Sequence, residues 1–162
     1  MTRALLLAVC AILPQNTVEG AMWCFIFKLL FAGMLRSGEL LPRTVEDLWK
    51  LPRNGHLRFV PADPDVRYST AHFILTLLGS KSDPERKGVE ICFTCDLDIG
   101  LLGAYHHYMG LRRLRFRSPD APLLCTNDGY WATYGKFTYW RHRIQRVLSL
   151  LHGAPLDHRW FT

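Results

Sequence analysis

The sequence lacks an apolar run long enough to span a membrane. Its longest apolar stretch, residues 21–35, is interrupted by Lys28 and falls short of the roughly 20 residues that a bilayer requires. Residues 4–13 imitate the apolar core of a signal peptide, but Pro14 ends that run, and Val18 and Gly20 match a cleavage site only loosely. We therefore expect a buried helix at residues 21–35, no membrane partner and no secretion. The alternative is a small secreted or membrane-associated protein.

Cysteine is present, but without the regular spacing of a disulfide framework. The five cysteines are an odd number, which fits a reducing compartment. Cys92 and Cys95 form one C-x-x-C pair that could be half of a zinc site with His106 or His107. No second pair completes that site. We expect no metal and no cofactor, and the alternative for the two thiols is burial at the end of a strand.

Internal repeats, low-complexity segments and carboxylate clusters are also missing. Hydrophobic residues make up 49% and charged residues 21% of the 162 residues, as is typical of one globular domain. Lys and Arg outnumber Asp and Glu by 20 to 14, which gives a net charge of +6, and the excess lies from Arg112 onward. This balance favours a polyanionic partner.

Apolar periodicity and turn residues predict an α+β fold. The strands are short, rich in β-branched and aromatic residues, and separated by turn residues; they are expected at residues 56–60, 72–78 and 88–94. Helices are expected at residues 3–13, 17–35, 42–51, 97–114 and 133–151, with Asn16 or Thr17 capping the second and Thr44 the third. Residues 121–125 are predicted to be extended and residues 127–129 a turn. The fold is therefore mainly helical, with a small three-stranded antiparallel sheet in a single domain.

Two local sequences carry a family resemblance. Residues 31–40 read FAGMLRSGEL, with Gly33, Arg36 and Glu39 at the spacing of the first conserved box of tyrosine recombinases. Residues 77–88 read LLGSKSDPERKG, which resembles the β-hairpin of that family that carries a catalytic lysine, here Lys81. The chain thus resembles the front part of a tyrosine recombinase catalytic domain of the kind found in eukaryotic mobile elements.

The resemblance implies DNA strand exchange on double-stranded DNA, with two catalytic residues in this chain. A guanidinium such as that of Arg36 can bind two phosphate oxygens and stabilise the extra charge of the transition state. Lys81, at the tip of a hairpin, can protonate the leaving sugar oxygen. The complete family works as a tetramer, and such a protein would act in the nucleus of a eukaryote, or otherwise in the cytoplasm.

Simpler explanations exist for each of these residues. Arg36 could pair with Glu39 one helical turn away, and Lys81 could be a solvated loop residue. The cations Arg112, Arg113, Arg115 and Arg117 are secondary candidates for DNA contacts, and the alternative is a solvated helix end. A non-catalytic nucleic-acid-binding module is therefore the second functional hypothesis.

The family pattern continues with a His-x-x-Arg box and a nucleophilic tyrosine, and neither has a counterpart in this chain. His158 and Arg159 are adjacent, so they do not have the spacing of the box. The missing helices should pack against those present. We therefore expect that faces around Trp23, Phe27 and Trp140 are exposed, which would favour aggregation.

We predict that this polypeptide alone forms no covalent adduct with a nicked suicide DNA substrate. Tyr130, Tyr134 and Tyr139 all lie upstream of the position where the missing box would begin, so none matches the attacking tyrosine. Denaturing gel electrophoresis of labelled DNA measures the adduct, with a complete recombinase on its own substrate as positive control. An adduct that persists after denaturation would contradict the prediction.

Overall fold

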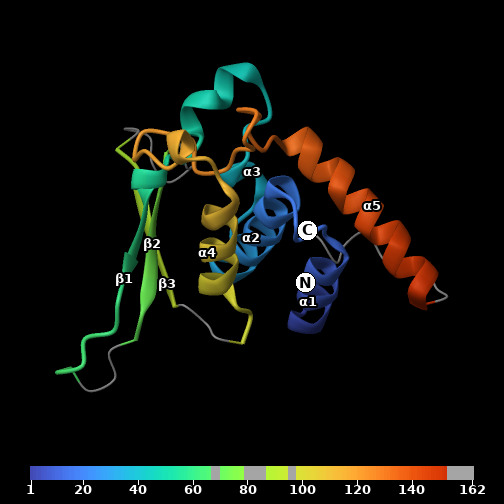
Figure 1. Ribbon diagram of the computed structural model, residues 1–162, viewed down its shortest axis with the longest axis horizontal. Helices are drawn as coiled ribbons and strands as arrows, with labels where there is room; N and C mark the ends of the chain where they lie inside the picture. Colours follow the sequence, from blue (N-terminus) through green and yellow to red (C-terminus); the bar gives the residue numbers. More distant parts are fainter. Residues whose placement is uncertain (67–69, 79–86, 95–97, 153–162) are drawn as a thin grey trace.

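The computed structural model describes residues 1–66, 70–78, 87–94 and 98–152. They form a three-stranded sheet and several helices, connected as shown in Figure 1. The α-helices are α1 (Arg3–Ile12), α2 (Val18–Ala32), α3 (Ser37–Leu40), α4 (Leu101–Leu111) and α5 (Tyr134–His152). Short 3-10 helices are η1 (Val45–Lys50), η2 (Asn54–His56) and η3 (Leu114–Phe116), and the strands are β1 (Leu57–Val60), β2 (His72–Leu77) and β3 (Val89–Thr94).

The sheet confirms the predicted strands and the α+β class. Its order is β1-β2-β3 and both pairs are antiparallel, with Phe73 opposite Phe59 on one side and opposite Phe93 on the other. Alternate residues of β2 are buried, as expected for a sheet with one face on the core. Phe73 joins the sheet to α4 through an edge contact with Tyr105, whose ring centroid lies 5.4 Å away.

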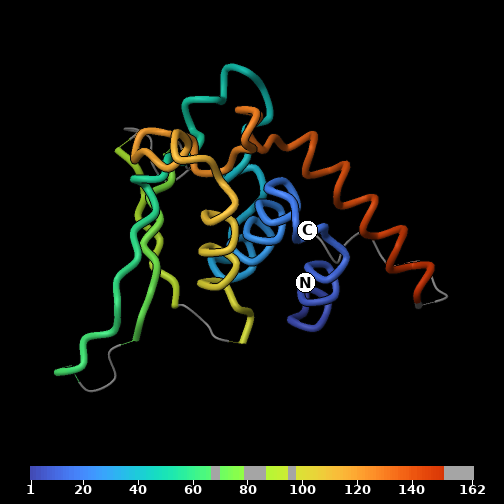
Figure 2. The backbone as a smooth tube through the Cα atoms, in the orientation of Figure 1, coloured from blue at the N-terminus to red at the C-terminus, as the bar shows by residue number. Residues whose placement is uncertain are grey.

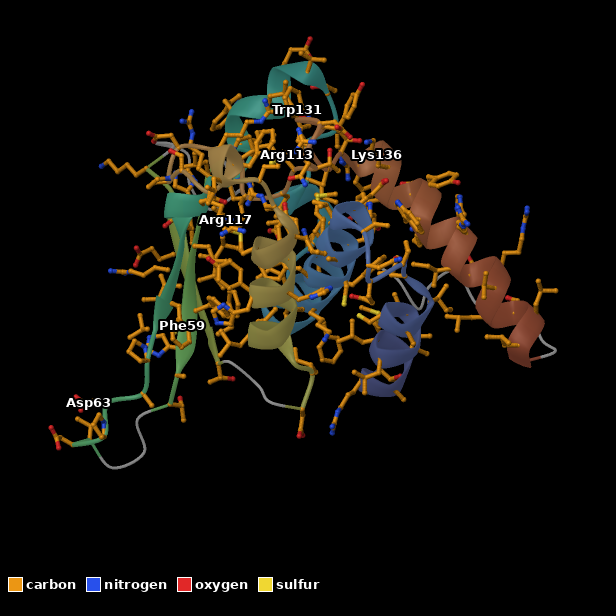
Figure 3. All side chains as sticks on the ribbon, in the orientation of Figure 1. Phe59, Asp63, Arg113, Arg117, Trp131 and Lys136 are labelled. Atoms are coloured by element: carbon orange, nitrogen blue, oxygen red, sulfur yellow. The ribbon has the colours of Figure 1, made fainter. Side chains whose placement is uncertain are left out.

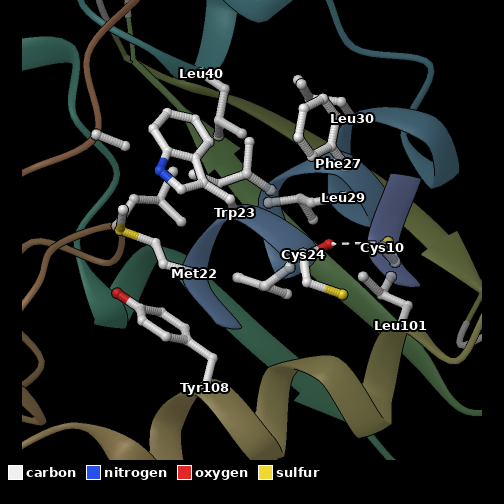
Figure 4. Packing of buried hydrophobic residues seen from close by; sticks show 14 of the residues in the cluster. Cys10, Met22, Trp23, Cys24, Phe27, Leu29, Leu30, Leu40, Leu101 and Tyr108 are labelled. Carbon is white, nitrogen blue, oxygen red and sulfur yellow. Dashed lines mark hydrogen bonds between the residues drawn. The ribbon is translucent and has the colours of Figure 1, made fainter. Parts of the chain in front are cut away.

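Helix α2 is the centre of the molecule. Ten of its 15 residues are buried, and a helix that is apolar on every side must be covered on every side. Phe25 stacks on Tyr108 of α4 with ring centroids 5.9 Å apart, and Phe27 meets Phe137 of α5 at 5.5 Å. Figure 4 shows this core, including the contact of the Cys10 Sγ with the Cys24 carbonyl oxygen, 4.0 Å apart, between α1 and α2.

The helices and the sheet form successive layers. The sheet lies at one side, α4 lies between the sheet and α2, and α1 and α5 lie beyond α2 (Figures 1 and 2). This packing makes the expectation of exposed aromatic faces wrong, because Trp23, Phe27 and Trp140 are only 0%, 1% and 9% exposed. None of the helices in the described residues is long and apolar enough to cross a membrane.

Several helical segments differ from the sequence-based expectation, and helix α2, for example, ends at Ala32 rather than at residue 35. Residues 45–50 form the 3-10 helix η1 in place of the predicted α-helix. None of its residues is buried, so tertiary packing does not support a longer α-helix there. Helix α4 ends at Leu111, three residues early, because Arg112 is extended (φ -77°, ψ 142°). The single turn α3 was not predicted.

Helix α2 begins where the sequence predicted, and its first turn is crowded. The Thr17 hydroxyl accepts a hydrogen bond from the Gly20 N–H at 3.0 Å, as an N-cap does. A Cβ atom at Gly20 would lie 2.1 Å from the carbonyl oxygen of Pro14, whereas one at Gly103 of α4 would meet nothing within 4 Å. Gly20 is therefore required by a close backbone approach, and Gly103 is not.

We predict opposite effects on stability for alanine at these two glycines. Gly20→Ala should lower the free energy of unfolding by about 1–3 kcal/mol, since the backbone must shift to admit the methyl group. Gly103→Ala should raise it by about 0.5–1 kcal/mol, because alanine favours an open helical position. Urea unfolding followed by circular dichroism measures both. A Gly20→Ala protein as stable as the wild type would contradict the α1–α2 packing.

Candidate nucleic-acid interface

The chain reaches Arg36 through a tight turn at the end of α2. The Leu35 N–H donates to the Leu30 carbonyl at 2.9 Å, and the Met34 N–H donates to the Phe31 carbonyl at 3.3 Å, the two bonds of a Schellman motif. Met34 takes the left-handed conformation (φ 49°) that usually requires glycine, which costs about 1 kcal/mol or more. The turn brings the chain out of the core, so that the next residues lie at the surface.

Arg36 is exposed, and its backbone is fixed by Glu39. The Arg36 N–H donates to the Glu39 Oε2 at 2.8 Å, so the carboxylate caps α3. The ion pair weighed from the sequence is not formed: among the described residues no ion pair includes Arg36. The backbone of Arg36 is therefore fixed, and its guanidinium remains available to a ligand.

Two hollows meet at Arg36. One is an apolar groove of about 810 Å³ whose lining includes Phe27, Phe31, Leu35 and Phe137, with Arg36 and Arg141 as its charged side chains. The other, of about 400 Å³, is lined by residues 36–43 together with Asp47 and Lys50 of η1. We call it the polar hollow because five of its ten lining residues are charged, three of them cations and two carboxylates. Arg36 is thus the cation shared by an apolar and a polar depression.

The polar hollow contains a second unpaired arginine, which sequence reasoning missed. The Arg43 guanidinium carbon lies 4.7 Å from the centre of the Tyr134 ring, and its nitrogens lie 3.3 Å from the position of a Cβ at Gly38. Asp47 is occupied by Lys50 at 2.6 Å, and this hydrogen bond holds the pKa of the Asp47 carboxyl below its usual value. Neither Arg36 nor Arg43 has a carboxylate partner within the described part of the chain.

Lys81, the second residue of the family resemblance, lies in the connection between β2 and β3, outside the described residues. The strands on either side of this connection are paired, from His72 opposite Thr94 to Leu77 opposite Val89. Cys95 also lies outside the described residues, so the structure does not test the half zinc site. No group of three or more potential metal ligands occurs where the structure is described.

Arg112 requires a correction, because it is buried rather than part of a DNA-contacting surface. It is only 2% exposed. One terminal nitrogen donates to Asn54 Oδ1 at 2.9 Å and the Leu123 carbonyl at 3.2 Å, and the other donates to the Pro122 carbonyl at 2.9 Å. The guanidinium also lies over the Tyr108 ring at 5.2 Å. Arg112 therefore holds distant segments together and cannot reach a phosphate.

The other three arginines of the cluster are exposed. The Arg117 guanidinium binds the end of α4, where it donates to the carbonyls of Arg112 at 3.1 Å and Gly110 at 3.0 Å. Arg115 donates to the Asn127 carbonyl at 3.2 Å. Arg113 is held through its backbone N–H, which donates to Asn127 Oδ1 at 2.8 Å, so its side chain has the greatest freedom to meet a ligand.

Comparison with protein-family models, with curated proteins and with solved structures gave no match.

We predict that removal of the Arg112 side chain lowers stability, whereas removal of the Arg113 side chain changes only the surface charge. Arg112→Ala removes the hydrogen bonds to Asn54 Oδ1 and to the Pro122 and Leu123 carbonyl groups and leaves a buried position unfilled. It should therefore lower the free energy of unfolding by about 3 kcal/mol. Arg113→Ala, the matched control, should change it by less than about 0.5 kcal/mol. Urea unfolding measures both values. Equal stability of the two variants would show that the Arg112 contacts contribute nothing.

Proposed function

We propose that this chain binds DNA through a surface centred on Arg36, as the front part of a tyrosine recombinase catalytic domain, whose complete members break and rejoin DNA. The observation that carries the proposal is the state of Arg36: exposed, free of any ion pair among the described residues, and fixed at its backbone by Glu39. A guanidinium in that state can accept a phosphate without first giving up another partner.

Arg43 supports this proposal. It lies between Gly38 and the Tyr134 ring, so its position is restricted before any ligand arrives, which reduces the entropy lost on binding. Both arginines line the polar hollow, whose carboxylates are already occupied, Glu39 by the Arg36 N–H and Asp47 by Lys50. The hollow therefore suits neighbouring phosphates of a DNA backbone better than a neutral ligand. In this proposal Arg36 holds the phosphate at which the complete family reacts, and Arg43 binds the neighbouring backbone.

The chemical step assigned to Lys81 rests on the resemblance alone. The residue types are right for metal-free phosphoryl transfer, in which arginine stabilises charge and lysine donates a proton. Binding of DNA and cleavage of DNA are separable properties, and the described residues support only the first.

We predict that Arg36→Gln weakens binding to a DNA duplex and reduces its salt dependence. The slope of log K against log salt concentration is negative, and loss of one phosphate contact should make it less negative by about 0.9. Fluorescence anisotropy of a labelled duplex over a series of salt concentrations measures the slope. Arg43→Gln should have a similar effect, since it removes a neighbouring contact.

The matched control is Arg3→Gln, which removes an equal charge from an exposed arginine that pairs with Asp98 at 3.1 Å. It should leave the slope unchanged. If Arg36→Gln and Arg3→Gln weaken binding equally, the interaction follows net charge and the proposed site is wrong. Absence of duplex binding by the wild-type chain at low salt would contradict the function itself.

A further inference from the structure

The turn between residues 125 and 131 presents an aromatic ring to solvent. Cys125 and Trp131 form an isolated antiparallel bridge, and the chain reverses at Gly129, which has φ 82°. Tyr130 is 64% exposed and Trp131 37% exposed. Tyrosine and tryptophan are enriched at interfaces, because they combine a large ring with a polar group.

Cations flank this turn on both sides. The Lys136 ammonium, in the first turns of α5, lies 5.1 Å from the centre of the Tyr130 ring. On the other side, Asn127 binds the Arg113 N–H through its side chain and the Arg115 guanidinium through its carbonyl. Arg113, Trp131 and Lys136 all lie in the upper part of the molecule as drawn in Figure 3. Asp128 is the carboxylate of the turn and is exposed.

The turn is rigid before any ligand binds. The Thr126 N–H donates to the Tyr130 carbonyl at 2.7 Å, and the Gly129 N–H donates to the Thr126 carbonyl at 3.1 Å. The Asn127 amide donates to the Leu111 carbonyl at 3.1 Å, which fixes the turn to the end of α4. A platform that is already ordered loses little entropy on binding.

We propose that this turn is a binding site for unpaired nucleotides, in which a base stacks on Tyr130 while Arg113, Arg115 and Lys136 contact the backbone phosphates. A duplex offers its phosphates but hides the faces of its bases, so the exposed ring adds nothing to duplex binding. A single strand uses both features, because stacking platforms beside a basic groove are how proteins bind single strands. The inference rests on the proposed function, since both require that this protein binds nucleic acid.

The test compares a labelled oligothymidine with a duplex of the same length by fluorescence anisotropy. Tyr130→Ala should weaken binding to oligothymidine about tenfold, within the range measured for loss of one stacked base, and should leave duplex binding within about twofold. Tyr130→Phe is the matched control and should bind oligothymidine as the wild type does, since it keeps the ring.

The outcomes separate the two proposals. If the wild type binds the duplex through Arg36 and Tyr130→Ala changes oligothymidine binding less than twofold, the stacking site is wrong and the proposed function stands. If oligothymidine is bound and depends on the Tyr130 ring while the duplex is not bound, the stacking site stands and the proposed function fails. Failure of oligothymidine to bind the folded wild type overturns the site.

Discussion

The arrangement of the long helices follows from the burial of α2. An apolar helix without a polar stripe cannot lie at the surface, so α1, α4 and α5 must each cover part of it. Its few polar groups are satisfied at its ends. Glu19 lies in the first turn, where the helix dipole favours negative charge, and its Oε1 accepts the indole N–H groups of Trp23 at 3.5 Å and Trp140 at 3.3 Å. This carboxylate therefore links α2 to α5 across 121 residues of sequence.

The same burial determines where Arg36 lies. A helix enclosed by its neighbours can leave the core only at its ends, and the Schellman turn at Met34 directs the chain outward within three residues of the end of α2. The strained left-handed conformation of Met34 persists because the flanking hydrogen bonds fix it. An arginine placed here has a rigid base and an exposed tip. Because the core fixes the backbone at this arginine, the arginine is suitable for the defined phosphate contact of the proposed function.

The sequence predicted those features that depend on local chemistry. The three strands, the Thr17 cap and the turn at residues 127–129 follow from β-branched residues, side-chain acceptors and glycine. Arg112 could not be assigned in this way, because its acceptors lie on residues 54, 122 and 123 and nothing in the run of arginines distinguishes it from Arg113. Arg43 was missed for a similar reason, since its ring partner Tyr134 is 91 positions away. Contacts between distant segments decide whether a cation is structural or available.

The arginines of this chain differ in whether their guanidinium groups are bound within the protein or are free to meet a ligand. The buried Arg112 guanidinium donates to carbonyl groups of the protein, and the Arg117 guanidinium donates to carbonyl groups at the end of α4. Arg36, Arg43 and Arg113 remain at the surface, and each is restricted by a contact elsewhere in its residue or side chain. Only for Arg43 does this contact involve the side chain, so part of its ordering cost, up to about 2 kcal/mol for a long side chain, is met during folding. Arg36 and Arg113 are fixed at the backbone alone. A polyanion that binds these side chains releases its counterions. It does not first have to break an ion pair or draw an arginine out of the core.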